Sequence, residues 1–387
     1  MRGSTAAILV RGMFSFSVLA SSGAARAGRL TTPHGRVETP AFMPVGTAGA
    51  VKATTRAQLE EAGAQILLAN TYHLMLRPGD ELVAERGGLH GFTGWPGPFL
   101  TDSGGYQVFS LAALRRVDDD GVSFRSHLDG TAHRLTPERA MDVQMNLGAD
   151  LVMAFDECPP STASREEIAA ATGRTTRWAR RSREAHRRAD QWLFGIVQGG
   201  VHLDLREKSA AEITALDLPG HAIGGLAVGE TKDDTWRVVE HVVPLLPADR
   251  PRYLMGVGTP EDILDGVARG IDLFDCVLPT RNGRNGQLFT RGGRLTIRNA
   301  RYRRDPRPPD AACGCYTCRT VSRAYLRHLH LAGEMTAATL MTVHNLTYYL
   351  DTLRAVRQNI LLGRFEEFRR EVLRALAASE AEADGGA

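Results

Sequence analysis

The chain has 387 residues, of which 43% are hydrophobic and 24% are charged, and its formal net charge is +3. This composition is typical of a globular protein and excludes a generally disordered chain. The length allows one large α/β barrel or two to three ordinary domains. Of the five cysteines, three form one cluster, and the other two, Cys158 and Cys276, provide no disulfide framework, which favours a reducing cytoplasm.

The first apolar stretch, 13–20, is predicted to be a β-strand. Basic residues precede it, and Ala25-Arg26-Ala27 imitates a signal-peptidase site. However, Ser15 and Ser17 interrupt the stretch, and residues 14–18 alternate as a strand does. We therefore treat residues 1–12 as an N-terminal extension. Because no run approaches about 18 apolar residues, we expect no membrane span.

The middle of the chain repeats one pattern, in which a short apolar run is followed by Gly and polar residues and then by an amphipathic stretch. This pattern is typical of βα units. Seven runs are candidate strands: 66–69, 99–100, 151–155, 193–197, 222–223, 253–255 and 273–274. Since the N-terminal region can supply another, we predict an α/β fold with a (β/α)₈ TIM barrel over residues 13–300.

Polar residues follow these strands, and in a barrel the strand ends converge on one mouth. Two carboxylates there can divide a glycosidic substitution into two displacements, and Asp102 and Asp275 are the best-placed pair. Asp156 is a third candidate, since a carboxylate accepts two adjacent N–H groups of a purine edge. A barrel-end cap or an ion pair with Arg281 is the alternative for Asp275. Dinucleotide and P-loop fingerprints are absent from the sequence.

Four potential metal ligands lie in the C-terminal part of the chain: Cys313, Cys315, Cys318 and, 26 residues later, His344. Three thiols so close together cannot readily bridge one another, whereas thiolates and an imidazole close around a tetrahedral ion. A filled shell of four ligands leaves no position for water. We therefore predict a structural zinc ion, with a redox or catalytic metal as the alternative.

Arginines crowd residues 281–307, where Asp305 is the one opposing carboxylate, and such a strip could meet a phosphate backbone. The alternative is that this chain simply prefers Arg, since Lys occurs only at 52, 208 and 232. A second basic run, 174–188, is interpreted as the solvated face of a helix.

The segment 301–376 is predicted to form a zinc-binding subdomain with C-terminal helices. It contains the cysteine cluster, a helix-like stretch at 321–331 and a long amphipathic stretch at 350–376. The last residues, 377–387, lack apolar periodicity, and we expect a disordered tail.

Several strings resemble the bacterial tRNA-guanine transglycosylase family, and so does the spacing of the cysteines and His344. The resemblance runs from about residue 13 to about residue 376. The strings are Asp102-Ser103-Gly104-Gly105-Tyr106-Gln107, Phe155-Asp156-Glu157-Cys158, Val197-Gln198-Gly199-Gly200, Gly224-Gly225-Leu226-Ala227-Val228-Gly229-Glu230 and Phe274-Asp275-Cys276-Val277-Leu278-Pro279-Thr280-Arg281.

The resemblance implies a zinc-bearing (β/α)₈ enzyme that exchanges guanine at the anticodon wobble position for a 7-deazaguanine precursor of queuosine. Asp275 would be the nucleophile and Asp102 the general acid/base. The remaining base-binding residues would be Ser103, Gly104, Gly105, Tyr106, Asp156, Cys158, Gln198, Gly225, Leu226 and Met255. Among them, Tyr106 and Met255 would sandwich the base, and the Leu226 carbonyl would accept the aminomethyl group.

The resemblance also implies partners: tRNA, guanine and 7-deazaguanine bases, and a second copy of the chain in a homodimer. The RNA-contacting residues would be Gly256, Val257, Gly258, Thr259, Pro260, Glu261, Asp262, Thr280, Arg281, Asn282, Gly283 and Arg284. Two alternatives stay open at this point. One is a catalytically silent tRNA-binding subunit, and the other is a retaining glycosidase that acts on a sugar polymer.

Overall fold

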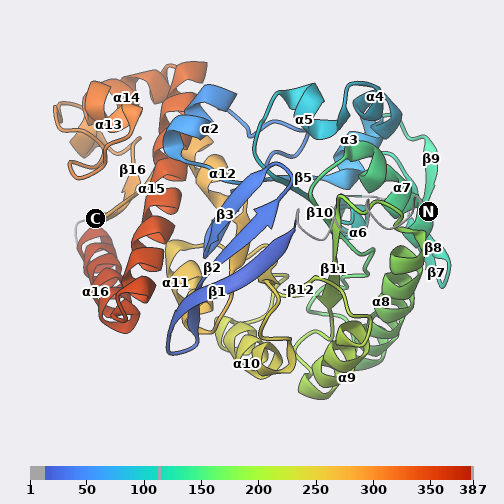
Figure 1. Cartoon of the computed structure of the whole chain (residues 1–387). Helices are drawn as coiled ribbons and strands as arrows, with labels where there is room; N and C mark the ends of the chain where they lie inside the picture. Colours follow the sequence, from blue (N-terminus) through green and yellow to red (C-terminus); the bar gives the residue numbers. More distant parts are fainter. Residues whose placement is uncertain (1–13, 112–114, 385–387) are drawn as a thin grey trace, which may run out of the picture.

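Eight parallel strands form a closed barrel (Figure 1). The computed structural model describes residues 14–111 and 115–384, so the predicted extension 1–12 lies outside the described residues. The strand order is β4-β14-β13-β12-β11-β10-β6-β5, and a parallel bridge between Val45 and Leu68 joins the two ends of the sheet. The barrel strands are β4 (Ala41–Pro44), β5 (Leu67–Ala69), β6 (Phe99–Thr101), β10 (Leu151–Met153), β11 (Trp192–Val197), β12 (Gly220–Ile223), β13 (Arg252–Leu254) and β14 (Leu273–Cys276). The predicted (β/α)₈ fold is confirmed.

Helices surround the barrel, and several begin at a polar cap that the sequence supplies. Ser164 and Glu167 form a reciprocal capping box at the start of α8 (Arg165–Ala185), and Thr259 caps α11 (Pro260–Ala268), which has proline at its first position. The helices between or after barrel strands are α2 (Arg56–Ala62), α3 (Thr71–Leu76), α4 (Asp80–Glu85), α5 (Gly88–Thr93), α6 (Gly105–Leu111), α7 (Pro137–Leu147), α8 (Arg165–Ala185), α9 (Leu203–Thr214), α10 (Lys232–Val242), the 3₁₀ turn η1 (Val243–Leu245), α11 (Pro260–Ala268) and α12 (Leu278–Arg284). The second basic run lies largely on α8, as predicted.

A small antiparallel sheet lies across one end of the barrel (Figure 1). It consists of β1 (Ser15–Ser22), β2 (Ala25–Thr32) and β3 (Gly35–Thr39). Phe14 stacks on Trp192 at the start of β11, and Arg26 pairs with Asp272 directly before β14, so this sheet covers the amino ends of the barrel strands. The predicted N-terminal strand therefore exists, but it closes the barrel floor, and the eighth barrel strand is β4.

A second antiparallel sheet is inserted between α6 and α7 and was not foreseen from the sequence. Its strands are β7 (Arg115–Asp118), β8 (Gly121–Arg125) and β9 (Ala132–Leu135). Val122, Phe124 and Leu135 pack there with Tyr72 and Trp178 in a separate hydrophobic cluster.

The C-terminal region packs as one unit with a hairpin that precedes it. The hairpin strands β15 (Gln287–Thr290) and β16 (Gly293–Thr296) share a hydrophobic cluster with α14 (Arg323–Leu331) and α15 (Met335–Leu361). The expected boundary at residue 300 thus falls inside this unit. The remaining elements are the 3₁₀ turn η2 (Ala300–Tyr302), α13 (Tyr316–Thr320), α14 (Arg323–Leu331), α15 (Met335–Leu361) and α16 (Phe365–Asp384).

The amphipathic stretch 350–376 lies on two helices, α15 and α16, because the chain turns at Gly363, whose φ of 70° suits glycine. One expectation about the C-terminal end needs correction. The segment 377–387, expected to be disordered, is helical as far as Asp384, since its alanines and glutamates favour a helix even without apolar periodicity.

Helix α15 links the C-terminal unit to the barrel. Tyr349 packs against Phe42 of β4 with ring centroids 5.0 Å apart, and its hydroxyl donates to the Gly258 carbonyl. Arg357 donates to backbone carbonyls of Gly28 and Thr39 in the floor sheet. In the described part of the chain, no helix has the combination of length and apolar character that crossing a bilayer requires.

Candidate active site

A cavity of about 530 Å³ opens at the carboxyl ends of the barrel strands. Its walls contain most of the residues that the sequence predicted for catalysis and base binding: Asp102, Ser103, Tyr106, Asp156, Cys158, Gln198, Gly225, Leu226, Met255 and Asp275. Gly104 and Gly105 lie directly beside it and shape the turn, because Gly104 N–H donates to Asp102 and Gly105 N–H to Ser103. The predicted site residues thus converge on one mouth.

Asp102 follows β6 and is buried among hydrogen-bond donors. Its Oδ1 atom accepts from Thr71 N–H at 2.9 Å, and its Oδ2 atom accepts from Gln107 Nε2 at 2.8 Å and from the Asn70 amide. Burial and, to a lesser extent, the nearby Asp275 charge raise the pKa of Asp102 to about 6, although the donors partly offset both effects. A carboxyl group with such a pKa can both give and take a proton near neutral pH.

Asp275 lies at the end of β14 and has a different set of partners. Its Oδ1 atom accepts from the Tyr253 hydroxyl at 2.6 Å and from Gly256 N–H at 2.8 Å. Among the described residues, none donates a hydrogen bond to Oδ2, so this oxygen is the one available to a substrate. Burial raises the pKa of Asp275, while the two donors favour its ionised form.

A third carboxylate, that of Asp156, is buried and forms one edge of the cavity with Gln198 and Ser103. Its Oδ1 atom accepts from Ser103 Oγ at 2.7 Å, and its Oδ2 atom accepts from Gln198 Nε2 at 2.8 Å. Burial raises the pKa of Asp156 and also raises the pKa of Cys158 to about 12, so this cysteine is a neutral thiol at neutral pH. The edge therefore offers acceptors and donors to a planar polar ligand.

Glu230 fixes the peptide between Leu226 and Ala227 at the same edge. Its carboxylate accepts from Ala227 N–H at 2.5 Å, from Val228 N–H at 3.0 Å and from the Thr235 hydroxyl at 2.6 Å. In a trans peptide the N–H and the preceding C=O point in opposite directions. Because Ala227 N–H points to Glu230, the Leu226 carbonyl points away from it.

Sequence reasoning did not assign roles to four residues that complete the site: Asn70, Gln107, Tyr253 and Glu230. A signal existed for Asn70, which directly follows the predicted strand 66–69, much as Asp102 closely follows the predicted strand 99–100. Tyr253 lies within a strand, and the inward direction of its side chain depends on the barrel's register, which the sequence does not give.

Both segments expected to contact RNA contain exposed and buried residues. Gly256 and Arg281 are exposed, whereas Val257, Thr280 and Gly283 are buried. Several arginines of the basic strip form ion pairs with carboxylates. The pairs are Arg291 with Asp310, Arg294 with Glu261 and Arg307 with Asp305. The strip is therefore less basic than its sequence suggests.

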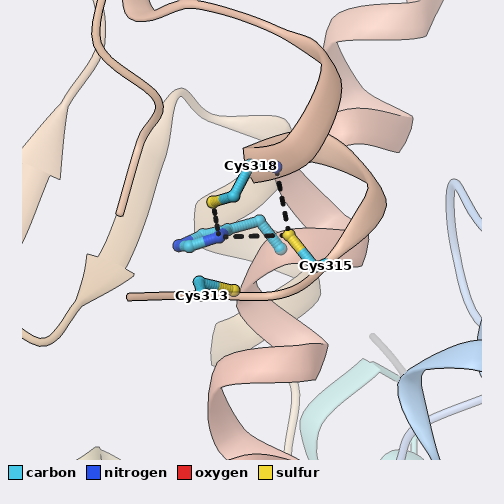
Figure 2. A group of neighbouring side chains, drawn as sticks. Cys313, Cys315 and Cys318 are labelled. Atoms are coloured by element: carbon cyan, nitrogen blue, oxygen red, sulfur yellow. Dashed lines mark hydrogen bonds between the residues drawn. The ribbon is translucent and has the colours of Figure 1, made fainter. Parts of the chain in front are cut away.

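The four predicted metal ligands come together in a buried cluster (Figure 2). The ligand atoms of Cys313, Cys315, Cys318 and His344 all lie within 4.8 Å of one another. His344 Nε2 is 2.8 Å from the Phe289 carbonyl, so it is the protonated nitrogen, and Nδ1 faces the thiols of Cys315 and Cys318 at 3.6 and 3.2 Å. This donor set can hold a metal ion.

A second group of possible ligands lies at the amino ends of the barrel strands, opposite the cavity. It consists of His34, His90 and Asp150. Asp150 accepts from His34 Nδ1 at 2.9 Å and lies 3.2 Å from His90 Nε2. The two imidazole rings are stacked with centroids 3.4 Å apart and an interplanar angle of 11°. Nearly parallel rings do not direct their lone pairs at a common ion, so we interpret this group as an ion-pair network that fastens the β2–β3 hairpin to the barrel.

Comparison with known proteins agrees with this geometry. A family model described as queuine tRNA-ribosyltransferase matches residues 21–378. The chain is similar to a queuine tRNA-ribosyltransferase of Pelotomaculum thermopropionicum, with 56% identity over 361 residues that cover 93% of this chain and 98% of the relative. It is also 57% identical over 361 residues to a queuine tRNA-ribosyltransferase of Thermus thermophilus, covering 93% and 94% of the two chains. The chain belongs to the queuine tRNA-ribosyltransferase family.

Proposed function

We propose that the chain is a tRNA-guanine transglycosylase. It exchanges guanine at position 34 of tRNAs with GUN anticodons for 7-aminomethyl-7-deazaguanine, in queuosine biosynthesis in the cytoplasm. The family and the relatives support this, and the observation that carries the proposal is the pairing of two unlike carboxyl groups in one cavity. Asp102 has a pKa of about 6, and Asp275 keeps one oxygen for bond formation.

In the first half-reaction, Oδ2 of Asp275 attacks C1′ of the target ribose. The C1′–N9 bond breaks, its electron pair goes to guanine, and Asp102 gives its proton to the departing base. The product is an ester between Asp275 and the ribose, and the phosphodiester chain is not cut. Tyr253 and Gly256 N–H hold the attacking carboxylate by its other oxygen.

In the second half-reaction, Asp102 takes the proton from N9 of the incoming base. The base attacks C1′, and the Asp275 carboxylate leaves. Two inversions at one carbon restore the original anomer. A single residue can serve both steps because its pKa lies near the working pH.

Base recognition is assigned to the edge formed by Asp156, Gln198 and the backbone N–H of Gly225. Asp156 would accept from the two adjacent N–H groups of guanine. Tyr106 is 51% exposed and half-buried Met255 faces the same cavity, so both are available to cover the base. The Leu226 carbonyl, turned by Glu230, would accept the aminomethyl group of the incoming base.

For the metal cluster we propose one structural Zn²⁺ per chain, held by Cys313, Cys315, Cys318 and His344. Three thiolates and one imidazole form a complete tetrahedral shell for zinc. When bound, the ion would cross-link α13 to α15 and supply folding energy without taking part in the chemistry.

For the RNA contacts we propose the segments Gly256–Asp262 and Thr280–Arg284. The exposed or half-buried residues there, such as Arg281, Asn282 and Arg284, would meet the anticodon loop, while the buried ones shape the segments. Single-stranded loops suit this purpose because their bases unstack at low cost.

We also propose a homodimer supported by the C-terminal unit. Several apolar residues there are strongly exposed, among them Tyr325 (51%), Leu331 (57%) and Met335 (87%). Aromatic residues and methionine are enriched in protein interfaces. A monomeric mass by light scattering at micromolar concentration would contradict the dimer.

The exchange can be tested with labelled guanine and unmodified tRNA whose anticodon begins with G. Incorporation of label into precipitated, full-length RNA is expected. Asp275→Ala should abolish it while tRNA binding persists. A folded, metal-loaded wild-type protein that incorporates no label would favour a silent tRNA-binding subunit, although both aspartates are present. Release of guanine without strand loss would exclude a glycosidase acting on sugar polymers.

A further inference from the structure

Arg206 lies beneath the base-recognition edge and belongs to none of the roles described so far. It is on α9, and its side chain is fully buried. Nε donates to the Gly200 carbonyl at 2.8 Å, and Nη1 donates to the carbonyls of Val197 and Gly224, each at 2.8 Å. Nη2 donates to the Gly225 carbonyl at 3.3 Å.

The partners of this cation are unusual. A buried guanidinium normally pairs with a carboxylate, because an unpaired buried charge is costly. In the described part of the chain, the hydrogen bonds that the Arg206 guanidinium donates all go to backbone carbonyls. Burial lowers the pKa of Arg206 to about 10, so the side chain remains charged at neutral pH. The buried guanidinium charge is thus stabilised by four backbone carbonyl oxygens, and it holds them in place.

These carbonyls flank the residues that face the base. Val197 and Gly200 enclose Gln198, and Gly224 and Gly225 lead to Leu226. In a trans peptide the C=O and the following N–H point to opposite sides. Because Arg206 binds the Gly224 carbonyl from the α9 side, Gly225 N–H faces the other way, where it lies against the cavity-lining thiol of Cys158.

The glycines in these turns are explained by the same packing. A Cβ atom on Gly225, whose φ is 65°, would lie 2.2 Å from Gln198 Oε1. A Cβ atom on Gly199 would lie 2.8 Å from the Arg206 backbone nitrogen. Helix α9 also supplies Ser209, whose hydroxyl accepts from Gln198 N–H at 3.1 Å. The base-reading edge therefore rests directly on α9 and on its Arg206 and Ser209 side chains.

We propose that Arg206 is a positioning residue for base specificity: by holding the Gly224 and Gly225 carbonyls, it directs Gly225 N–H at the 6-oxygen of the purine. This inference rests on the proposed function, in which Gly225 N–H reads guanine. Arg206, a residue outside the cavity, would thus help to select a purine with an oxygen at position 6 over a base with a weaker hydrogen-bond acceptor there.

The test compares the binding of two free bases, guanine and 6-thioguanine, to the full chain by calorimetry. The two share the N–H groups that Asp156 would read, but sulfur is the weaker acceptor. Wild type should prefer guanine. In Arg206→Met, the guanine Kd should rise about tenfold, as expected for one misdirected hydrogen bond, while the 6-thioguanine Kd changes much less. The preference for guanine should therefore shrink.

Two further variants keep the test decisive. Arg206→Lys retains a buried cation, but a lysine cannot reach four carbonyls, so this variant should also reduce the preference for guanine. It replaces Arg206→Met in the test if Arg206→Met does not fold. Arg237→Met removes an arginine from neighbouring α10, where it contacts Asp234, and should leave the preference unchanged. An undiminished preference in folded Arg206 variants would overturn the inference alone. Wild-type protein that binds neither base would overturn the proposed function together with it.

Discussion

The Tyr253 hydroxyl donates to Oδ1 of Asp275 at 2.6 Å, and this contact joins a fully buried tyrosine to a half-buried carboxylate in the mouth of the barrel. The tyrosine remains a donor, because burial and the Asp275 charge raise the pKa of Tyr253 well above its ordinary value. This contact stabilises the ionised carboxylate and fixes which oxygen faces the substrate.

Tyr253→Phe should slow formation of the covalent RNA adduct about tenfold to hundredfold, as expected for loss of a hydrogen bond to a charged group. The rate can be followed on denaturing gels under single-turnover conditions. Because the ring is retained, the Tm should change little. An unchanged adduct rate would show that the hydroxyl does not support the nucleophile.

The pKa of about 6 for Asp102 predicts opposite pH dependences for the two half-reactions. Adduct formation needs the protonated acid, so its rate should fall as pH rises through about 6. Adduct breakdown by the incoming base needs the ionised form, so its rate should rise over the same range. Gln107 donates to Asp102 and thereby lowers the pKa of Asp102. Gln107→Met should therefore shift the pH dependences of both half-reactions to higher pH. Unchanged pH dependences in this variant would contradict the assignment of Asp102 as the general acid/base.

Cys315→Ser should remove the metal and destabilise the C-terminal unit. Cys315 also caps α13, since its sulfur accepts from Cys318 N–H. We expect a loss of one zinc equivalent by elemental analysis and a fall in Tm of about 5 °C or more. Thr320→Ala, at an exposed position at the end of the same helix, is the matched control. Loss of zinc without a change in Tm would refute the structural role.

Arg284 should contribute to tRNA binding through charge. One of its nitrogens, Nη1, is buried without a hydrogen-bond partner in the described structure, on the wall of a basic pocket with Arg298 and His330. Arg284→Gln should weaken tRNA association and flatten its dependence on salt concentration, because a contact with phosphate releases counterions. Measuring Kd at several salt concentrations provides the check, and an effect confined to free-base affinity would contradict the placement.

His34 should make stability depend on pH. Its hydrogen bond to Asp150 raises the pKa of His34. Burial raises the pKa of Asp150, but the contacts of Asp150 with His34, His90 and Phe99 N–H together hold that pKa well below its usual range. Asp190 also raises the pKa of His34, and Arg188 lowers it. A raised histidine pKa adds stability that is present below about pH 6.5 and is lost as pH rises through the folded-state value. His34→Gln should therefore lower Tm more at pH 6 than at pH 8.5, and equal losses would contradict this network.

The sequence was sufficient to predict the barrel, the carboxylates at its mouth and the four side chains of the metal cluster in the C-terminal unit. Apolar runs such as 193–197, each followed by glycine and polar residues, mark strands whose ends must converge once the fold is recognised. Arg206 and Tyr253 could not be predicted in this way. Their roles depend on side-chain direction and on contacts with backbone carbonyls, which no residue pattern records. The β7–β9 sheet was missed because its strands have only four or five residues and contain few apolar side chains.

The position of α15 has a consequence for how the protein is made. The ribosome synthesises the chain from its N-terminus, so β4 emerges long before the helix that covers it. Until residues 335–361 are released, Phe42 lacks its partner Tyr349 and the floor sheet lacks Arg357. The same helix carries His344, so the metal cluster can be completed only at this late stage. The covering of β4 and the completion of the metal cluster therefore both wait for α15, so the two events are coupled during synthesis.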